Sequence, residues 1–128
     1  MPAINGKVIR DIVVISDIVM KGKRRMEDQK VTVIAYIEVK PGGEAEFLAA
    51  AAEVVAATRA EEACINYDLH QSSDNPAKFV FYENWTSLAG LDQHSKSAHI
   101  QTFRSRIGDL LARPTEITLW QMKSEVAG

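Results

Sequence analysis

The chain has little cysteine and no long apolar run. One cysteine, Cys64, occurs among 128 residues, so no internal disulfide can form, which fits a reducing compartment. No apolar stretch approaches the ~18 residues of a membrane helix, and the N-terminus lacks the basic, apolar and small-residue regions of a signal peptide. We therefore expect a cytoplasmic protein that does not bind membranes. The position of Cys64 at the start of an apolar strand pattern favours a small core residue over a nucleophile.

The sequence also lacks an excess of charge of either sign. It contains 15 Lys and Arg against 17 Asp and Glu, with a formal net charge of −2. No overall basic field exists to hold a phosphate backbone, so nucleic acid is not expected as a partner. No glycine-rich phosphate loop, Ser/His/Asp order or CxxC pair is present. Nucleotide-binding, serine-hydrolase and thiol-redox functions are therefore not expected.

The length predicts one domain with an appendage at each end. A chain of 128 residues buries a single core and does not need a second domain. Residues 1–30 form an N-terminal extension, in which the β-branched segment Val8–Met20 fits both a strand and a helix by periodicity, and we favour the strand. The compact domain covers residues 31–122, and residues 123–128 form a tail.

Hydrophobic periodicity within the compact domain predicts four strands and three helices. A Pro-Gly-Gly turn ends the first strand and acidic residues begin the first helix. Thr86 or Ser87 can cap the second helix, and Ser97 can cap the third. The order β-α-β-β-α-β, with a helix pair in the second helical position, predicts a ferredoxin-like α+β sandwich with an antiparallel sheet. The expected strands are 31–39, 64–71, 78–85 and 115–122, and the expected helices are 44–62, 87–95 and 97–111.

The predicted strands are apolar on both faces. In the strand over 78–85, Phe79 and Phe81 alternate with Val80 and Tyr82. An antiparallel sheet with one face in water would alternate apolar and polar residues instead. A second layer must therefore cover the face away from the helices, and the simplest source is the same sheet of another subunit. We predict a homodimer.

Two of the three histidines, His94 and His99, are the main titratable candidates. On an unbroken helix their i, i+5 spacing would set them about 140° apart, unlike the i, i+4 pair that grips one zinc ion. A break near residues 95–97 would allow them to converge. No carboxylate or cysteine set accompanies them at a recognised metal spacing, so we expect no metal, and a surface or capping role for each histidine stays open.

Polar and aromatic residues on the strands are further candidates. Glu83 and Trp85 share one face of a strand with Phe81, and a carboxylate among aromatic residues must either hydrogen-bond or rise in pKa. Glu83 is therefore a base, an orienter of a histidine or a structural strut. Asn66 and Tyr67 alternate on the neighbouring strand, and whether Tyr67 lines a pocket or fills the core stays open.

These residues resemble the antibiotic biosynthesis monooxygenase (ABM) family, within the dimeric α+β barrel superfamily. The run over 61–67 reads Glu-Glu-Ala-Cys-Ile-Asn-Tyr and is similar to the family's Glu-Glu-Gly-Cys-x-x-Tyr signature, with Ala63 in place of the glycine. Glu83-x-Trp85 followed by His94 and His99 repeats the spacing of the bacterial quinol monooxygenase branch. The similarity covers Val31–Met122. It implies a ferredoxin-like homodimer whose sheets face each other, with a pocket between sheet and helices in each subunit.

The resemblance also implies a reaction. Members of the family oxidise small aromatic quinols or phenols with molecular oxygen and without flavin, haem or metal, so the implied partners are an aromatic substrate and O2, and no cofactor is expected. The implied site has a base, an aromatic wall and polar orienters. These are His94 or His99 as the base, Trp85, Tyr67 and Phe81 as the wall, and Asn66 or Glu83 as orienters.

Three departures from the family's patterns narrow the substrate. Phe81 and Leu91 stand where the polyketide-pathway monooxygenases carry Asn and Tyr, and Ala35 stands where the haem-degrading branch carries Asn. Both branches are therefore disfavoured. An isomerase of a small phosphorylated signalling sugar resembles the same pattern with Tyr in place of Trp85, and a non-catalytic, stress-related ligand-binding dimer is the third alternative.

Overall fold

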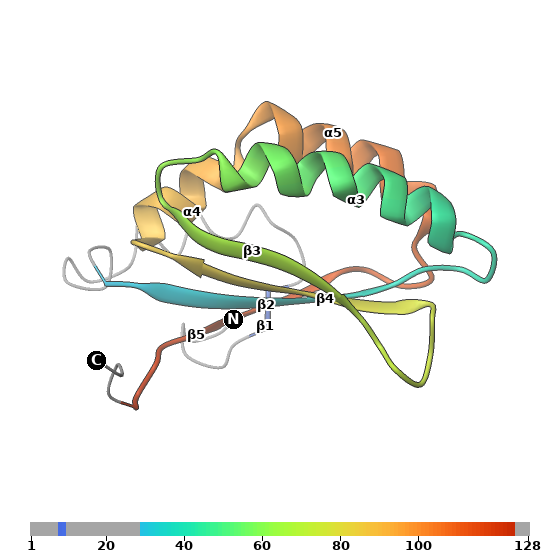
Figure 1. Cartoon of the computed structure of the whole chain (residues 1–128), viewed down its shortest axis with the longest axis horizontal. Helices are drawn as coiled ribbons and strands as arrows, with labels where there is room; N and C mark the ends of the chain where they lie inside the picture. Colours follow the sequence, from blue (N-terminus) through green and yellow to red (C-terminus); the bar gives the residue numbers. More distant parts are fainter. Residues whose placement is uncertain (1–7, 10–28, 125–128) are drawn as a thin grey trace.

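The computed structural model describes residues 8–9 and 29–124. The compact part has the predicted order of elements (Figure 1). Most of the expected strand over Val8–Met20 lies outside the described residues, and only Val8–Ile9 is described there, as a two-residue strand. The elements are β1 (Val8–Ile9), β2 (Val31–Glu38), α3 (Glu44–Arg59), β3 (Cys64–Gln71), β4 (Lys78–Trp85), α4 (Leu88–Ser95), α5 (Ala98–Ile107), the 3-10 helix η1 (Gly108–Leu110) and β5 (Glu116–Trp120).

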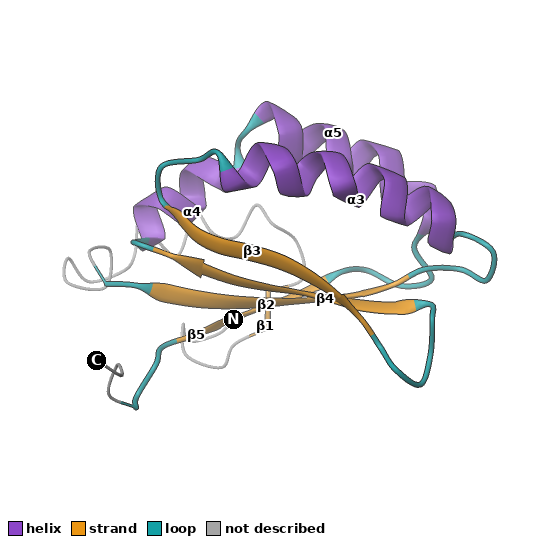
Figure 2. Ribbon diagram, in the orientation of Figure 1, coloured by secondary structure: helices purple, strands orange, loops and turns teal. Residues whose placement is uncertain are grey.

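The sheet is antiparallel throughout, with the strand order β1-β5-β2-β4-β3. The helices α3, α4 and α5 lie on one face of it, and no helix of the described residues covers the other face (Figures 1 and 2). The predicted ferredoxin-like α+β class is confirmed. None of the helices in the described ranges is long and apolar enough to cross a membrane.

The core lies between the sheet and the helices because each strand turns alternate side chains toward them. In β2, Val33, Ala35 and Ile37 are buried while Tyr36 is exposed. From α3, Phe47 packs its ring against the core, with a centroid 4.5 Å from that of Phe79 on β4. This layer fixes the distance between the helices and the strands that carry the candidate site.

The helix α3 ends at Arg59, three residues before the predicted end at Glu62. The N–H of Glu61 bonds to the carbonyl oxygen of Thr58 at 2.9 Å, which tightens the chain into a turn before β3 begins at Cys64. Glu61 therefore leaves the helix, and its carboxylate lies in the turn next to the ends of α4 and α5.

The predicted break between the two histidines is present. Ser97 caps α5 as expected: its Oγ accepts a hydrogen bond from the N–H of Ile100 at 3.3 Å and donates one to the carbonyl oxygen of His94 at 2.8 Å. Ser87 caps α4 in the same way, accepting from the N–H of Gly90 at 3.0 Å. Because α4 and α5 are separate helices, the angle of a continuous helix no longer sets the orientation of the histidines.

Candidate functional site

Both histidines meet at one carboxylate oxygen. The Nδ1 of His94 and the Nε2 of His99 each lie 2.7 Å from Oε2 of Glu61. The turn after α3 supplies the carboxylate, the last turn of α4 supplies His94, and the first turn of α5 supplies His99. Glu61 was absent from the predicted site residues. Its signal was its place as the first residue of the Glu-Glu-Ala-Cys run, beside the predicted pocket strand.

His94 is the more buried of the two imidazoles. Its side chain is 6% exposed, against 27% for His99, and its ring centroid lies 4.7 Å from that of Trp85 and 5.4 Å from that of Tyr67. Burial lowers the pKa of His94, and the hydrogen bond and charge of Glu61 work in the opposite direction. Since the carboxylate accepts at Nδ1, the neutral ring carries its proton there and leaves Nε2 as an unprotonated base.

A cavity of about 240 Å³ lies between the sheet and α5. Apolar side chains form most of its wall, with β2 and α5 supplying three each, and a small set of polar groups interrupts them. This volume is slightly below the roughly 300–1,000 Å³ of drug-sized ligand pockets, so the cavity suits a small molecule. Of the predicted site residues, Tyr67, Phe81, Glu83 and His94 line this cavity, whereas Trp85, Asn66 and His99 do not.

Glu83 is a buried acid in the cavity wall. The indole N–H of Trp85 donates to its Oε1 at 2.8 Å. Burial raises the pKa of Glu83 to about 8, because this one hydrogen bond offsets only part of the lost hydration, and the nearby Glu61 carboxylate adds to the rise. At neutral pH Glu83 is therefore largely protonated, and it can donate a hydrogen bond as well as accept one.

Trp85 stands behind the site. It is fully buried, binds Glu83 through its N–H and packs its ring against His94. We predicted that Trp85 would form a wall of the pocket. In the structure it instead supports two side chains that reach the cavity. Tyr67 fills both roles that the sequence left open, because it is buried, packs on Phe81 with ring centroids 4.8 Å apart, and lines the cavity.

Asn66 lies on the opposite face of the sheet. Its amide donates to Oδ2 of Asp68 at 3.0 Å and to the carbonyl oxygen of Tyr82 at 3.2 Å, and its Oδ1 accepts from Asn84 at 2.9 Å. Tyr67 takes the inward position, so its neighbour Asn66 must point outward. The geometry therefore does not support Asn66 as an orienter of a substrate in the cavity.

Two other residues complete the description of the site's surroundings. Burial and nearby carboxylates raise the pKa of Cys64 to about 11, so its thiol stays protonated at neutral pH, in line with a non-nucleophilic role. Arg104 lines the cavity from α5 and donates from Nη2 to the carbonyl oxygen of Ser95 at 2.9 Å. Sequence reasoning missed Arg104. The signal was a cation at position 104 of a helix whose inward face also includes Ile100 and Phe103.

One group in the described part of the chain has the spacing of metal ligands, and it consists of Glu61, His94 and His99. Their ligand atoms lie within 4.8 Å of one another. Around a metal at about 2.1 Å, such atoms lie roughly 3.0–3.4 Å apart. Both nitrogen–oxygen separations are 2.7 Å, the length of a charge-assisted hydrogen bond. The arrangement seen is a hydrogen-bonded triad, and a metal would need the carboxylate to withdraw from both rings.

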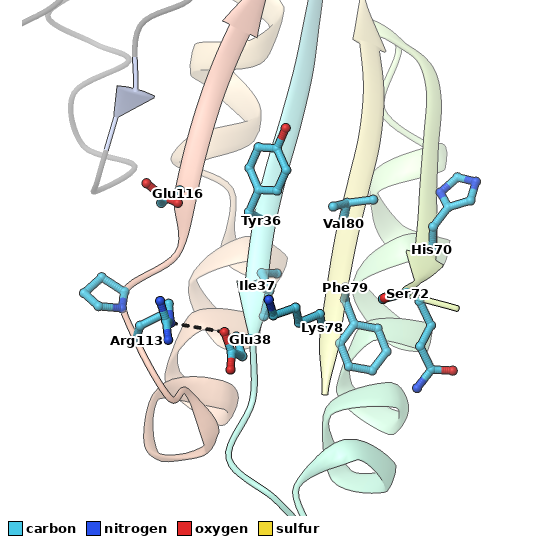
Figure 3. Close-up of a pocket in the computed structure, with 12 residues that line it drawn as sticks. Tyr36, Ile37, Glu38, His70, Ser72, Lys78, Phe79, Val80, Arg113 and Glu116 are labelled. Carbon is cyan, nitrogen blue, oxygen red and sulfur yellow. Dashed lines mark ion pairs between the residues drawn. The ribbon is translucent and has the colours of Figure 1, made fainter. Parts of the chain in front are cut away.

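A second recess of about 370 Å³ lies at one end of the sheet, largely on the face away from the helices. Figure 3 shows Tyr36, Val80 and His70 on three neighbouring strands of its floor, and an ion pair between Arg113 and Glu38 at its edge, with 3.2 Å between the paired atoms. Exposed ion pairs of this kind contribute little to stability and do not by themselves indicate a functional site. We place the candidate site in the inner cavity because buried titratable groups converge there.

The fold and the site together define a class: a ferredoxin-like α+β protein with a carboxylate–imidazole pair opening on a small, mostly apolar cavity. Residues 30–106 match the family described as antibiotic biosynthesis monooxygenase, and the chain belongs to this family.

Two relatives of this chain carry names of the same kind. It is 35% identical over 89 residues to "Putative monooxygenase Rv0793" of Mycobacterium tuberculosis, covering 70% of this chain and 87% of the relative. It is 37% identical over 83 residues to "Putative monooxygenase YcnE" of Bacillus subtilis, covering 65% and 87%. An uncharacterised Synechocystis protein is 32% identical over 95 residues. The match covers 74% of this chain and only 65% of that protein's length.

The Rv0793 structure superposes with a TM-score of 0.72 at 32% identity, over 77% of this chain and 100% of that one. The family and the names support a monooxygenase-like function.

Proposed function

We propose that the protein oxidises a small aromatic quinol or phenol with molecular oxygen, without a bound cofactor. The observation that supports this most directly is the position of His94, which holds the Glu61 carboxylate with Nδ1 and lines the apolar cavity with the same ring. This is the arrangement of a general base with its orienting carboxylate, beside a space suited to an aromatic ring.

Proton removal is the step that the site is built to assist. A phenol with a pKa of about 10 costs roughly 4 kcal/mol to ionise at pH 7. In the proposal, Nε2 of His94 takes the hydroxyl proton, and the Glu61 carboxylate stabilises the imidazolium that forms. His99 shares the same carboxylate from the more exposed side and helps to hold it in place. We therefore assign the base to His94 and a positioning role to Glu61 and His99.

The electrons for oxygen come from the substrate. A quinol that loses four electrons becomes a hydroxyquinone: one oxygen atom of O2 enters the ring and the other leaves as water, so no external reductant is required. Protons must return to the reduced oxygen during this sequence. Glu83 is protonated at neutral pH and lies in the same wall as His94, which suits it to donate one.

A second candidate is the isomerase of a small phosphorylated sugar. The observation in its favour is the guanidinium of Arg104 in the cavity wall, together with a base and an acid that could move a proton between carbon and oxygen. The mostly apolar wall suits an aromatic ring better than a sugar phosphate. Incorporation of solvent deuterium into a ketose phosphate, with no oxygen uptake, would identify this activity.

We further propose that the protein acts as a homodimer. The large apolar side chains Tyr36, Tyr82 and Trp120 alternate with buried residues on β2, β4 and β5, and each is more than 40% exposed. The strand register puts all three side chains on one face of the sheet. No helix of the described residues covers that face (Figure 2). A second copy would bury this face. We also infer a cytoplasmic location, which the single cysteine supports.

The function is tested by oxygen uptake of the purified, chelator-treated protein with a panel of reduced naphthoquinols, corrected for spontaneous oxidation. We expect saturable uptake that falls by roughly 10²- to 10⁴-fold in His94→Ala. The exposed histidine on the outer face provides the matched control, and His70→Ala should keep the full rate. Uptake no faster than buffer, or a His94→Ala variant as active as the parent, would contradict the proposal.

A further inference from the structure

The cavity is polar at one end and apolar at the other. Cross-strand pairing sets Glu83 between Val33 and Tyr67 in one row of the sheet, and His94 packs against this row. The guanidinium of Arg104 reaches the carbonyl oxygen of Ser95 beside it. All polar side chains of the lining except one gather at this end. They are Tyr67, Glu83, His94, Ser95 and Arg104.

The other end is apolar and lies nearer the surface. From Val33 to Ile37 the floor strand β2 advances four residues, or about 13 Å. There the lining consists of Ile37, Ile107 and Leu111, with the exposed Pro114 and the half-buried Thr115 at the rim. A molecule that enters from this rim must pass an apolar neck before it reaches His94.

The side chain on the floor of the cavity between its two ends is small. Ala35 lies midway, paired with Phe81 on β4 and Ile117 on β5, and it offers only a methyl group where its neighbours on β2 are Val33 and Ile37. This small residue keeps the passage open from the rim to the polar end.

We propose that the site selects amphipathic aromatic ligands, with a hydroxylated or carbonyl-bearing ring at the His94 end and an unbranched apolar tail in the neck formed by Ile37, Ile107 and Leu111, with Thr115 at its rim. The identity of the ring rests on the proposed function. The tail is inferred from the difference between the polar and the apolar end of the cavity. An apolar chain gains affinity with each methylene it buries, whereas a charged chain of equal length loses hydration in the neck.

Binding is measured by calorimetry under anaerobic conditions with oxidised naphthoquinones, which cannot turn over. The probes share one ring and carry a methyl group, a hexyl chain, or a hexyl chain that ends in a carboxylate. We expect the hexyl probe to bind at least roughly tenfold more tightly than the methyl probe, because several methylenes become buried. The carboxylate probe should lose this gain, because its charged end gives up hydration in the neck.

Two variants locate the tail. Thr115→Asp places a charge at the rim and should weaken the hexyl probe by about tenfold while it leaves the methyl probe within about twofold. Thr102→Asp makes the same change on the exposed side of α5, outside the cavity, and should leave both probes unchanged. Ala35→Leu fills the floor and should weaken the hexyl probe more than the methyl probe.

The outcomes separate this inference from the proposed function. Equal affinity of the parent protein for the methyl and hexyl probes, or equal weakening of both by Thr115→Asp, would overturn the amphipathic selection even if oxygen uptake were observed. Tighter binding of the hexyl probe that is lost in Thr115→Asp would support the selection, even if no quinol supported oxygen uptake. In that case the proposed oxidation would be wrong and the amphipathic selection would stand.

Discussion

At the scale of single residues, the site depends on one carboxylate that serves two rings. Oxygen Oε2 of Glu61 accepts from Nδ1 of His94 and from Nε2 of His99. The carboxylate thereby fixes the tautomer of His94 and counteracts the fall in its pKa that burial causes. Removing its charge should change the chemistry of His94 more than the packing around it.

The variant Glu61→Gln tests this positioning role. We expect kcat to fall by roughly 10- to 100-fold, by analogy with other groups that orient a reactive imidazole. The pKa of His94 should fall further, because the charge that raises it is gone. A pH titration of the His94 ring by NMR measures this directly, and the acid limb of the rate profile should move to lower pH. A lower rate with an unmoved His94 titration would show that Glu61 acts only through packing.

Glu83 gives a prediction about stability. Its pKa is about 8 in the folded protein against an ordinary value of 4.5. Between these values the folded state binds more protons than the unfolded state, so the free energy of unfolding should fall as pH rises from about 4.5 to about 8 and then level off. The loss should be on the order of a few kcal/mol.

The neutral, isosteric variant Glu83→Gln should remove this contribution to the pH dependence. Its free energy of unfolding should match that of the parent near pH 4.5 and exceed it above pH 8, because no charge must be buried. Urea titrations at a series of pH values measure the difference. Parallel curves for the two proteins across this range would contradict a raised pKa at Glu83.

At the scale of elements, the turn that carries Glu61 packs closely on α4. A Cβ at Gly90 would lie 2.3 Å from the Cβ of Ala63, far inside normal contact. Gly90 is therefore required where α4 meets the start of β3. The same contact explains why Ala63 can stand where the family signature carries glycine. The space between positions 63 and 90 holds one methyl group but not two.

The variant Gly90→Ala should lower the free energy of unfolding by about 1–3 kcal/mol through overpacking. The double variant Ala63→Gly with Gly90→Ala should recover most of this loss, because the methyl group changes sides. Gly108→Ala is the control, since its Cβ would meet no atom within 4 Å. Denaturant titration of the set measures the coupling, and additive effects of the two substitutions would contradict the contact.

At the scale of the whole molecule, the uncovered face of the sheet has the composition of an interface. Tyr82 is 41% exposed on this face, and Leu48 on α3 is 42% exposed on the helical side. The two side chains are equally accessible, so charge substitutions at them compare the two sides of the molecule on equal terms.

Light scattering after size-exclusion chromatography should give the parent protein at twice its chain mass of 14.2 kDa. Tyr82→Glu places a charge in the proposed interface and should yield the monomer mass at micromolar concentration, whereas Leu48→Glu should stay dimeric. A monomeric parent protein, or equal dissociation by both variants, would contradict the proposed interface.

The sequence by itself determined the elements and their order. The strands over 64–71 and 78–85 have the predicted bounds, and Ser87 and Ser97 cap the helices as expected. These features follow from local causes, namely the two-residue and 3.6-residue periods of apolar side chains and the hydrogen bonds of capping hydroxyls. The ferredoxin-like class followed from that order.

Tertiary structure alone decided which of these residues meet. Glu61 was predicted within a helix, but α3 ends earlier and the turn carries its carboxylate to rings 33 and 38 residues away in the chain. The inward position of Tyr67 sends Asn66 to the opposite face, and Arg104 reaches the cavity because the inner side of α5 faces the sheet. Periodicity reports which face a residue shares with its neighbours along the chain. It does not report which distant side chain lies opposite, because that depends on how the layers pack.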